Sequence, residues 1–206
     1  MSNCENTNQM TFSQNKENPV WPAGSSTQVG TERKTTTPLR SFRHFLFQDW
    51  GSNPHDFRIR MVLVAFRLAT WIHHQKPEVR FLLSFYFILY RIVVVWLFHM
   101  ELHWKLSVGE GLCIHHGFCL VVHPDTLIGK HVTLLHGATL GNKGPNSGAP
   151  TLEDFVEVGA HAIIIGPVIV GQRAIVGAGA VVTKHVPSGV IVAGNPARII
   201  SPQNEK

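Results

Sequence analysis

Histidine is the residue type in this chain best suited to acid–base chemistry, and 13 of the 206 residues are histidine. Two of them, His115 and His116, are adjacent and are followed by Gly117. Histidine can take a proton from a hydroxyl group near neutral pH because its pKa lies close to that pH. A carboxylate on the other ring nitrogen would fix the tautomer and stabilise the protonated ring. Taken alone, however, two adjacent histidines are more simply explained as surface residues.

The elements that must position these histidines are repeats of six residues between Val108 and about Arg198. Apolar residues recur at every sixth position, a period that fits neither an α-helix nor an ordinary half-buried strand. The first phase contains Val108, Ile114 and Leu120, and the second contains Ile128, Leu134, Leu140, Leu152, Val158, Ile164, Val170, Val176 and Val182. A small or apolar residue follows most of these anchors after four positions, namely Val132, Ala138, Val156, Ala162, Val168, Ala174, Ala180 and Val186. This pattern is typical of a hexapeptide β-helix, in which each hexad forms one strand and one corner, so we expect a mainly β fold with about five coils.

The repeat is interrupted at two places. Its phase slips by two residues at residues 122–125, and the segment GNKGPNSGAPT, residues 141–151, separates Leu140 from Leu152. Glycine and proline at this density predict a loop that leaves the coil. Binding residues often lie in loops that project from a rigid scaffold, so we expect this loop near the functional site.

The residues outside the repeat divide into three parts. Residues 1–40 are rich in Asn, Thr, Gln, Ser and Pro and contain few aliphatic residues, so we expect a disordered tail. We expect residues 41–103 to form a helical domain, residues 104–200 the β-helix and residues 201–206 a second tail. Residues 57–74 predict an amphipathic helix, whose apolar face is expected to contain Met61, Val64, Ala65, Leu68 and Ile72.

The most apolar segment of the chain, residues 81–98, lies at the end of this helical domain. Its length is near the minimum for a membrane span, but it contains Arg91, and an arginine at the bilayer centre costs at least about 2.5 kcal/mol. We therefore expect a helix buried against its neighbours and against symmetry mates. Peripheral contact with a membrane is the alternative.

The composition narrows the classes of partner and compartment. The formal net charge of +5 fits an anionic cofactor, a membrane surface or a nucleic acid, but no nucleic-acid-binding motif accompanies it. The three cysteines, Cys4, Cys113 and Cys119, lack the spacing of a disulfide framework, and the polar N-terminus is unlike a secretory signal. We therefore expect a cytoplasmic protein that binds no nucleic acid.

Three segments of the chain resemble a known family: IHHG at residues 114–117, LHGATLGN at 135–142 and AGNPAR at 193–198. They are similar to the serine acetyltransferase-like hexapeptide acyltransferases, and most similar to the colanic-acid-type exopolysaccharide O-acetyltransferases. The likeness extends over residues 50–200. It implies a left-handed parallel β-helix, acetyl-CoA as co-substrate, and direct transfer of an acetyl group to a hydroxyl with a histidine as the base.

The resemblance also implies site residues. In serine acetyltransferases the base is the histidine of an Asp-His-Gly/Ala element, and an earlier aspartate orients it. The corresponding residues are His116 as the base and Glu101 as the carboxylate. His115 replaces the aspartate that helps to hold the ammonium group of serine, and Ala149 replaces a histidine of the family's Arg-His-Pro-Lys-Ile segment. A serine site without that carboxylate should bind serine poorly, so we expect a sugar hydroxyl as the acceptor and His115 in acceptor binding.

Coenzyme A is implied to lie in a groove between neighbouring subunits, which requires a homotrimer or a dimer of trimers. By position, the pantetheine channel would be lined by Gly141, Ala160 and Ala178, and the phosphates would face Lys143, Lys184 and Arg198.

Two other functions remain open. Serine O-acetyltransferase of cysteine biosynthesis is the first. The second is a zinc enzyme, because γ-type carbonic anhydrases share the expected fold and carry zinc-binding histidines at the spacing of His131 and His136. No third ligand is evident from the sequence, so we expect no metal. His136 is otherwise expected to be structural or to pack behind the reacting groups.

Overall fold

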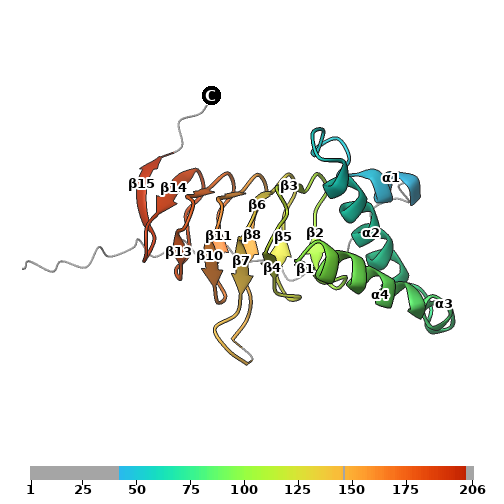
Figure 1. The fold of residues 1–206 in the computed structure, drawn as a ribbon. Helices are drawn as coiled ribbons and strands as arrows, with labels where there is room; N and C mark the ends of the chain where they lie inside the picture. The colour runs from blue at the N-terminus through green and yellow to red at the C-terminus, as the bar shows by residue number, and fades with distance from the viewer. Residues whose placement is uncertain (1–41, 146, 203–206) are drawn as a thin grey trace, which may run out of the picture. The chain divides into compact units, whose positions relative to one another are not determined.

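The computed structural model describes residues 42–145 and 147–202, so the tail expected at residues 1–40 lies outside the described residues, as do residues 203–206 of the second tail. From Met100 onward, short strands form a parallel β-helix with three faces (Figure 1). Face A consists of β1 (Met100–Leu102), β4 (Leu120–Val122), β7 (Thr139–Gly141), β10 (Ile163–Ile165) and β13 (Val181–Val182). Face B consists of β2 (Ser107–Val108), β5 (Leu127–Ile128), β8 (Thr151–Leu152) and β11 (Ile169–Val170). Face C consists of β3 (Cys113–His115), β6 (Thr133–Leu135), β9 (Glu157–Val158), β12 (Ile175–Val176), β14 (Val190–Ala193) and β15 (Arg198–Pro202), of which β15 is antiparallel.

The hexad anchors form the core of the coil. All of them are buried except Val108, which is partly buried, and the residues four positions after them are buried too. Anchors of successive coils pair in register, as Leu134 does with Val158 and Leu140 with Ile164. Apolar side chains therefore stack along the coil axis, where the coils on either side remove them from water. The predicted β-helix of hexapeptide repeats is confirmed.

The corners of the coil need backbone conformations that few residues adopt. At the corner between faces B and C, His131, Phe155 and Arg173 have φ between 52° and 62°. The N–H of His131 donates to the carbonyl of Glu110 in the preceding coil, at 2.9 Å. The residue below the His131 ring is Gly111, also at positive φ, and a Cβ there would collide with the ring. Glycine is therefore required beneath this corner.

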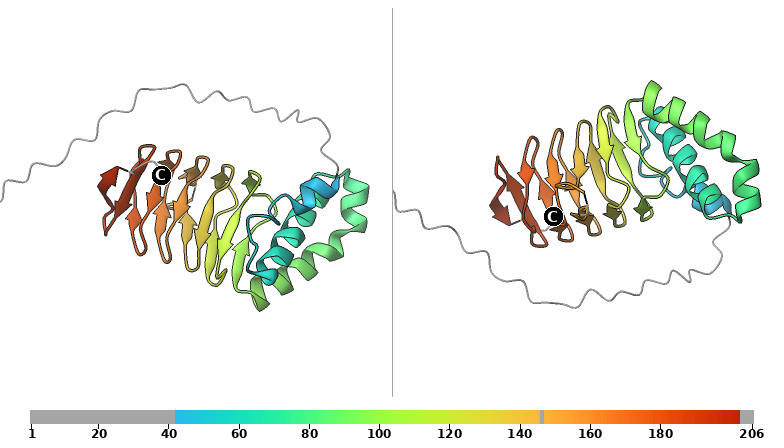
Figure 2. Two further views of the ribbon diagram at one scale, coloured as in Figure 1. Left: turned by 90° about the horizontal axis from the view of Figure 1, so that it is seen from above. Right: turned by 90° about the horizontal axis from the view of Figure 1, so that it is seen from below.

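Among the described residues, five helical segments precede the coil and lie against its β1 end (Figures 1 and 2). They are α1 (Phe42–Phe47), α2 (Phe57–His73), α3 (Pro77–Leu82), α4 (Ser84–Tyr90) and the π-helix η1 (Arg91–Leu97). Helix α2 begins after Asp56, whose carboxylate accepts the N–H groups of Arg58 and Ile59 and so caps the helix.

Helix α2 has the predicted length but buries a different face. Met61 is exposed, and Val64, Ala65 and Leu68 are only partly buried. The buried apolar residues are Ile59, Val62, Leu63, Phe66, Ala69 and Ile72. The predicted face was wrong because the helix is apolar around most of its circumference, and because its central charged residue, Arg67, lies on the buried side.

Residues 81–98 do not form the single helix that the sequence predicts, and within one chain most of them are not fully buried. The segment is divided among α3, α4 and η1, and within it only Tyr90 and Val94 are fully buried. Packing against α2 and β1 removes one side of these helices from water, whereas the apolar pattern continues around the other side. Among the described residues, no helix is long and apolar enough to cross a membrane.

The boundaries of the β-helix differ slightly from the expected ones. Strand β1 begins at Met100, inside the range 41–103 expected for the helical domain, and β15 extends to Pro202, beyond the boundary expected at residue 200. In β1, Met100 and Leu102 point into the core and Glu101 points out. Between β7 and β8 the chain leaves the coil as a loop (Figure 1), as the glycine- and proline-rich segment predicts.

A buried polar network joins α2 to the first coil. The guanidinium of Arg67 donates to both carboxylate oxygens of Asp49, at 2.8 and 3.1 Å. It also donates to the backbone carbonyls of Val108 (2.8 Å) and Gly109 (2.6 Å). The Asp49 carboxylate accepts the N–H of Leu112 at 2.9 Å. A buried charge without a partner lowers the stability of the fold. The Arg67 guanidinium and the Asp49 carboxylate therefore each need the other in order to stay buried.

Asn53 extends this network to the strand that precedes the histidine pair. Its side-chain amide donates to the carbonyl of Leu112, and its Oδ1 accepts the N–H of Ile114, both at 2.9 Å. Ile114 directly precedes His115 in β3. The segment between α1 and α2 therefore fixes the backbone of the strand that leads into the candidate site.

Candidate active site

The corners between faces C and A bring two histidines and two alanines into one row. We call these corners, residues 116–119, 136–138, 159–162 and 177–180, the C–A edge. Strand register aligns His116 with His136, His136 with Ala160, and Ala160 with Ala178 in successive coils. The expected base and two of the residues expected to contact pantetheine thus lie along the same edge of one chain.

His116 is the first residue after β3 and has an exposed side chain and a φ of 60°. Its ring meets the ring of His136 nearly at right angles, with centroids 5.9 Å apart. The His136 ring in turn meets His161, at 5.0 Å. The Nδ1 atom of His136 is buried and has no hydrogen-bond partner within the described residues. His136 is therefore a direct neighbour of His116 and occupies the space between two other imidazoles.

The sequence pattern does not predict His161 as a neighbour of this row. His161 lies one position beyond the residue that aligns with His136, and its ring covers Gly137, where a Cβ would collide with it. The six-residue period would place such residues together, but the phase slip at residues 122–125 and the loop at 142–150 change the spacing between successive corners.

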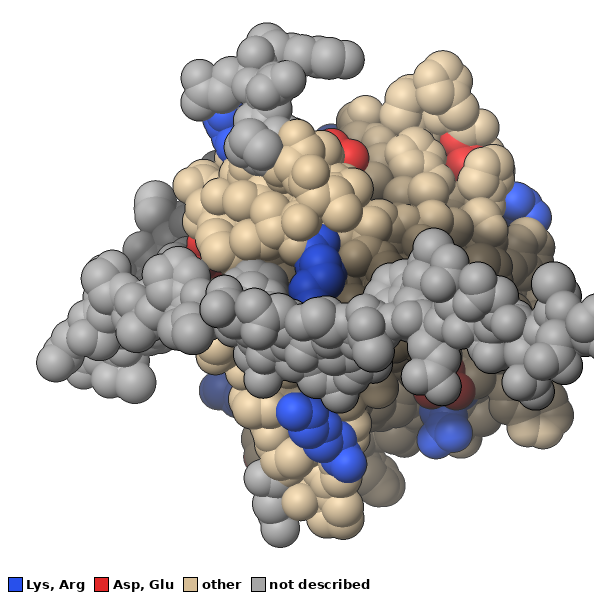
Figure 3. Space-filling view, turned by 90° about the vertical axis from the view of Figure 1, so that its left-hand side faces the viewer, with Lys and Arg blue, Asp and Glu red and all other residues tan. Residues whose placement is uncertain are grey.

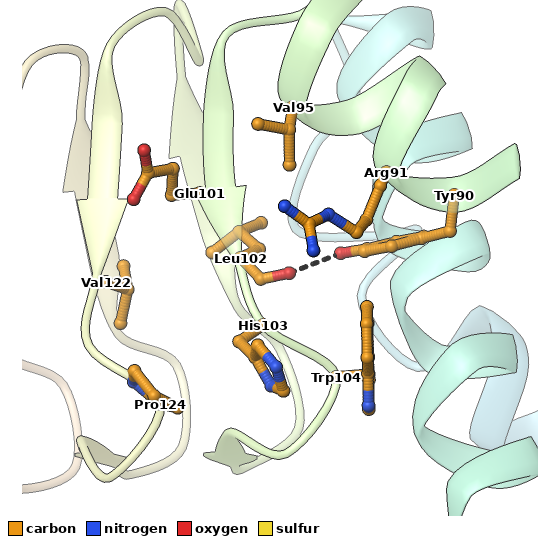
Figure 4. A pocket seen from close by; sticks show the side chains of 9 residues that line it. All are labelled: Tyr90, Arg91, Val95, Glu101, Leu102, His103, Trp104, Val122 and Pro124. Carbon is orange, nitrogen blue, oxygen red and sulfur yellow. Dashed lines mark hydrogen bonds between the residues drawn. The ribbon is translucent and has the colours of Figure 1, made fainter. Parts of the chain in front are cut away.

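Glu101 lies on a pocket of about 250 Å³ between β1, β4 and η1 (Figure 4). The pocket is lined by Tyr90, Arg91, Val95, Glu101, Leu102, His103, Trp104, Val122 and Pro124. Figure 4 shows the guanidinium of Arg91 and the carboxylate of Glu101 entering it from different elements. The hydroxyl of Tyr90 donates to the carbonyl of Leu102 at 2.7 Å, which holds the helical wall against β1.

One side of the pocket has an aromatic wall. The Trp104 ring contacts His103, at a centroid distance of 4.3 Å, and Phe87, at 4.7 Å. Burial lowers the pKa of His103, and the positive charges of Lys105, His73 and Arg91 lower it further. The lowered pKa favours the neutral ring of His103, and the carboxylate of Glu101 and the guanidinium of Arg91 line the same pocket.

Within one chain the expected pair, Glu101 and His116, does not meet. Glu101 is the central residue of β1 and pairs with Val121 on face A, whereas His116 lies at the C–A edge before β4 begins. No hydrogen bond or ion pair joins the two side chains in the part of the chain that the structure describes. One chain therefore does not bring together the pair that the resemblance implies.

His115, the expected acceptor-binding residue, ends β3 and has an exposed side chain. Its Nε2 lies 3.5 Å from the Sγ of Cys113. Burial is the main reason that the pKa of the Cys113 thiol is raised, so this thiol is uncharged beside the imidazole. His115 and His116 project from the same turn of the coil, at consecutive positions.

The residues expected to bind coenzyme A divide between two edges. Ala160 and Ala178 lie on the C–A edge, whereas Gly141, Lys143 and Lys184 lie where face A turns into face B. Arg198 is the first residue of β15, and its exposed guanidinium donates to the carbonyl of Ala197. One chain therefore brings together two subsets, and the structure does not unite them into one continuous lining.

Lys143 has a defined place in the loop after β7. Its backbone N–H donates to the Oγ of Ser147 at 2.8 Å, and the N–H of Gly144 donates to the same oxygen at 3.0 Å. The aliphatic part of the Lys143 side chain packs over Gly166 of the next coil. The lysine is exposed, so its charge is available to a ligand along this edge.

Basic side chains are dispersed over the face that ends the coil. Figure 3 views the molecule from the β15 side, and the Lys and Arg side chains visible there lie apart from one another, with Asp and Glu side chains on the same face. A continuous basic surface is the usual electrostatic feature of a nucleic-acid-binding protein. The basic side chains visible on the described part of this face do not form such a surface.

The two histidines of the zinc alternative lie at different corners. His131 is at the corner between faces B and C, where its ring stacks on Phe155 at 5.2 Å, and His136 is on the C–A edge. Strand β6 separates them. Among the described residues, no three His, Cys, Asp or Glu side chains are grouped so that they could hold a metal ion.

Comparison with known proteins identifies the same repeat. Residues 149–184 match the family described as bacterial transferase hexapeptide (six repeats). WcaB of Escherichia coli K12, a colanic acid biosynthesis acetyltransferase by name, is 32% identical over 158 residues, which cover 75% of this chain and 98% of WcaB. A serine acetyltransferase of Synechococcus elongatus is 37% identical over 141 residues, which cover 67% of this chain and 55% of that protein.

Solved structures show the same architecture. The serine acetyltransferase of Brucella abortus in complex with coenzyme A superimposes with a TM-score of 0.65 and 31% identity, covering 80% of this chain and 70% of that one. The left-handed β-helix that the resemblance implies is therefore the fold of this chain. Three observations are consistent with one family. They are the hexad core, the histidine row on the C–A edge and the match to nearly all of WcaB. The chain belongs to the hexapeptide-repeat acetyltransferase family.

Proposed function

We propose that the protein transfers the acetyl group of acetyl-CoA to a hydroxyl group of a sugar in exopolysaccharide biosynthesis, with His116 as the general base. The observation that carries this proposal is the match to WcaB, which covers 98% of that relative and 75% of this chain. The exposed ring of His116 on an edge lined by small residues provides a place where a hydroxyl and a thioester could meet.

In the proposed reaction, His116 accepts the proton of the acceptor hydroxyl while the oxygen attacks the thioester carbonyl. The C–S bond then breaks, and the protonated imidazole returns its proton to the sulfur of coenzyme A. A carboxylate beside the imidazole would stabilise its protonated form, which is the role proposed for Glu101. The net change is one ester formed and one thioester broken, and no redox step is needed.

The distribution of residues supports a site shared between two chains. In one chain, Glu101 lies on face A and His116 on the C–A edge, and the residues proposed for coenzyme A divide between two edges. If the C–A edge of one subunit lies against face A of the next, His116 of one chain lies beside Glu101 of the other. The same contact brings together the two groups of residues proposed for coenzyme A. Cyclic symmetry repeats that contact around a closed ring. We therefore propose a homotrimer, or a dimer of trimers, whose sites lie between subunits.

A mixture of two inactive variants tests this shared site. Chains with His116→Ala and chains with Glu101→Ala, co-expressed with different affinity tags and purified on both, should transfer acetyl groups faster than either variant alone. In a ring, every mixed trimer contains one site with both native residues, whereas a site within one chain would contain none. Light scattering should give the mass of a trimer or a hexamer. A monomer at micromolar concentration, or a mixture as inactive as its components, would contradict the shared site.

The C–A edge and the face A–face B corners have the features that a coenzyme A groove requires. Small residues at Ala160 and Ala178 let a narrow chain such as pantetheine approach the backbone, and a Cβ added to Gly141 would meet only open space. The exposed charges of Lys143 and Arg198 suit phosphates. Lys184 is also exposed on this side, although it already interacts with another group in the chain.

The acceptor separates the proposed function from its main competitor. His115 and Ala149 occupy positions where the serine acetyltransferase pattern has Asp and His, so a serine ammonium group would lack its carboxylate. An unpaired buried charge costs several kcal/mol, which opposes serine binding. The aromatic wall of the pocket at Trp104, together with the charged groups of Glu101 and Arg91, is compatible with a polar ring that has one apolar side.

Release of coenzyme A should therefore be faster with sugars than with serine. We expect activity against members of a panel of nucleotide-linked and lipid-linked sugars, and slow release with serine. The control is a bona fide serine acetyltransferase assayed in parallel. Serine turnover at about 10 s⁻¹ or more with a sub-millimolar KM, which is typical of metabolic enzymes, would establish the serine alternative instead.

Serine O-acetylation remains the second candidate because of a specific observation. The serine acetyltransferase of Synechococcus elongatus has a higher identity over its aligned residues, 37%, than WcaB has, 32%.

The proposed location of the enzyme is the cytoplasm. The described cysteines, Cys113 and Cys119, are both free thiols, as is usual in a reducing compartment.

A further inference from the structure

The outer side of α3, α4 and η1 carries a continuous row of exposed apolar side chains, which we call the apolar helix face. Phe81 is 82% exposed, Phe85 70% and Trp96 75%. The other members are Leu82, Ile88, Leu89, Ile92 and Leu97. Their spacing of three and four residues places them along one side of the helical segment. Large apolar patches of this kind mark interaction surfaces.

The opposite side of α3, α4 and η1 packs against the rest of the protein. The hydroxyl of Tyr86 donates to the carbonyl of Ala65 in α2 at 3.0 Å, and that of Tyr90 donates to Leu102 in β1 at 2.7 Å. Val94 is fully buried. In both views of Figure 2, α3 and α4 lie on the side of α2 that faces away from the coil. The helices are therefore fixed by their inner side, and the apolar helix face is presented outward.

The charges around this face are mainly positive. Between residues 74 and 99 the chain contains Lys76, Arg80 and Arg91, with Glu78 as the single acidic residue. Lys76 and Arg80 are exposed at the start of α3, next to Phe81 and Leu82. Trp96 lies near the other end of the row, and tryptophan is a preferred side chain at the boundary between lipid headgroups and hydrocarbon. Apolar residues flanked by basic ones are typical of helices that lie in a membrane interface.

We propose that the apolar helix face docks the protein on the surface of an anionic membrane, with α3, α4 and η1 lying parallel to the lipid plane. The apolar side chains enter the boundary between headgroups and acyl chains, and Lys76 and Arg80 contact anionic headgroups. The described helices are too short and too interrupted to span, so binding is confined to one leaflet surface. This inference does not depend on which acceptor the enzyme uses.

The charge distribution favours a lipid surface over a second copy of the chain. A two-fold contact would bring the same face of two subunits together, so Lys76 and Arg80 of each would lie in a contact that offers Glu78 as its acidic partner. An anionic membrane supplies many negative charges for the same residues. Residues 1–40 are a poor cover for the face, because their sequence contains few aliphatic residues.

Sedimentation with vesicles tests the proposal on the full-length chain. The protein should pellet with vesicles of phosphatidylcholine mixed with phosphatidylglycerol, and much less with phosphatidylcholine alone. Replacing three protruding residues, in Phe81→Ser/Phe85→Ser/Trp96→Ser, should weaken partitioning at least about tenfold, because each loses apolar area that would enter the membrane. Replacing two charges, in Lys76→Gln/Arg80→Gln, should weaken it about fivefold for each charge removed, and only on anionic vesicles.

The matched control is Ile200→Ser, which removes an apolar side chain that is 64% exposed on β15, at the other end of the coil. This variant should pellet like the native chain. Because the substituted residues are exposed, all variants should keep the native melting temperature and coenzyme A affinity. If the triple variant loses fold, the charge variant still provides the test.

Three results would overturn the proposal. The first is no sedimentation of the native chain with anionic vesicles. The second is unchanged sedimentation of both the apolar and the charge variant. The third is a fall in the mass measured by light scattering, without vesicles, to a half or a third of the native value when the three apolar residues are replaced, since this would mean that the face is buried between copies. None of these results bears on acetyl transfer to a soluble acceptor, so the proposed function is tested separately.

Discussion

Replacing His116 by alanine should lower kcat by a factor of about 10²–10⁴, while coenzyme A affinity stays near its native value. The imidazole is the one group that the proposal assigns to taking the proton of the hydroxyl, so its loss leaves the acceptor to react without a base. The side chain is exposed and its ring meets that of His136, so its removal should not unfold the coil. Single-turnover acetyl transfer and separate coenzyme A titration measure the two effects.

Three further substitutions act as controls for this result. Glu101→Gln should reduce kcat less than His116→Ala does, because the amide still accepts a hydrogen bond but has no charge to stabilise the protonated ring. His115→Ala should act mainly on the KM of the acceptor. His136→Ala should have little effect beyond local packing, although its ring touches that of His116. Near-native transfer by His116→Ala would remove the proposed mechanism, and loss of activity on replacing His131 and His136 would revive the zinc alternative.

Replacing Asp49 by alanine should lower the free energy of unfolding by about 3–5 kcal/mol. The substitution leaves the guanidinium of Arg67 buried without its carboxylate, and leaves the N–H of Leu112 without an acceptor. Urea denaturation, followed by the fluorescence of the tryptophans in the helical segment, measures the change. The control is Glu110→Ala, which removes the partner of Lys130 in an exposed ion pair and should cost at most about 1 kcal/mol.

A double variant distinguishes the ion pair from its contacts with the coil. Asp49→Leu/Arg67→Met removes both charges, and such replacements are often neutral when the two charges serve only each other. Here Arg67 also binds the carbonyls of Val108 and Gly109, so the double variant should stay destabilised. Full recovery of stability would mean that these backbone contacts contribute little.

The hexad pattern predicted the coil because one physical constraint acts on every repeat. Each anchor, such as Leu134 or Ile164, must fit the same small interior, so the sequence repeats wherever the structure does. The loop after β7 was predictable for a related reason, since its glycines and prolines replace the anchor. The helical domain lacks such a constraint. Helix α2 is apolar on most sides, and the buried side is chosen by the Arg67–Asp49 contact between distant residues, which no local pattern contains.

The candidate site was predictable in its residue types and less so in its arrangement. The position of His116 on an exposed corner agrees with a base, but the contact between its ring and His136 depends on the alignment of two coils. His161 joins the same row only because the loop at residues 142–150 and the phase slip at 122–125 set that alignment. The separation of Glu101 from His116 is likewise a property of three-dimensional register, which fifteen residues of sequence spacing do not reveal.

The contacts between the helical segment and the first coil also limit how these molecules can associate. A stack of parallel coils exposes unpaired backbone groups at each end. The first coil of one copy could therefore join the last coil of another, head to tail, and form filaments. Here side chains occupy those groups on all three faces: Tyr90 binds Leu102 on face A, Arg67 binds Val108 on face B, and Asn53 binds Ile114 on face C. At the other end, the antiparallel β15 closes face C. Because the helical end of the coil is covered on all three faces, head-to-tail joining of copies through that end is disfavoured, which leaves the sides of the coil for the proposed ring of subunits.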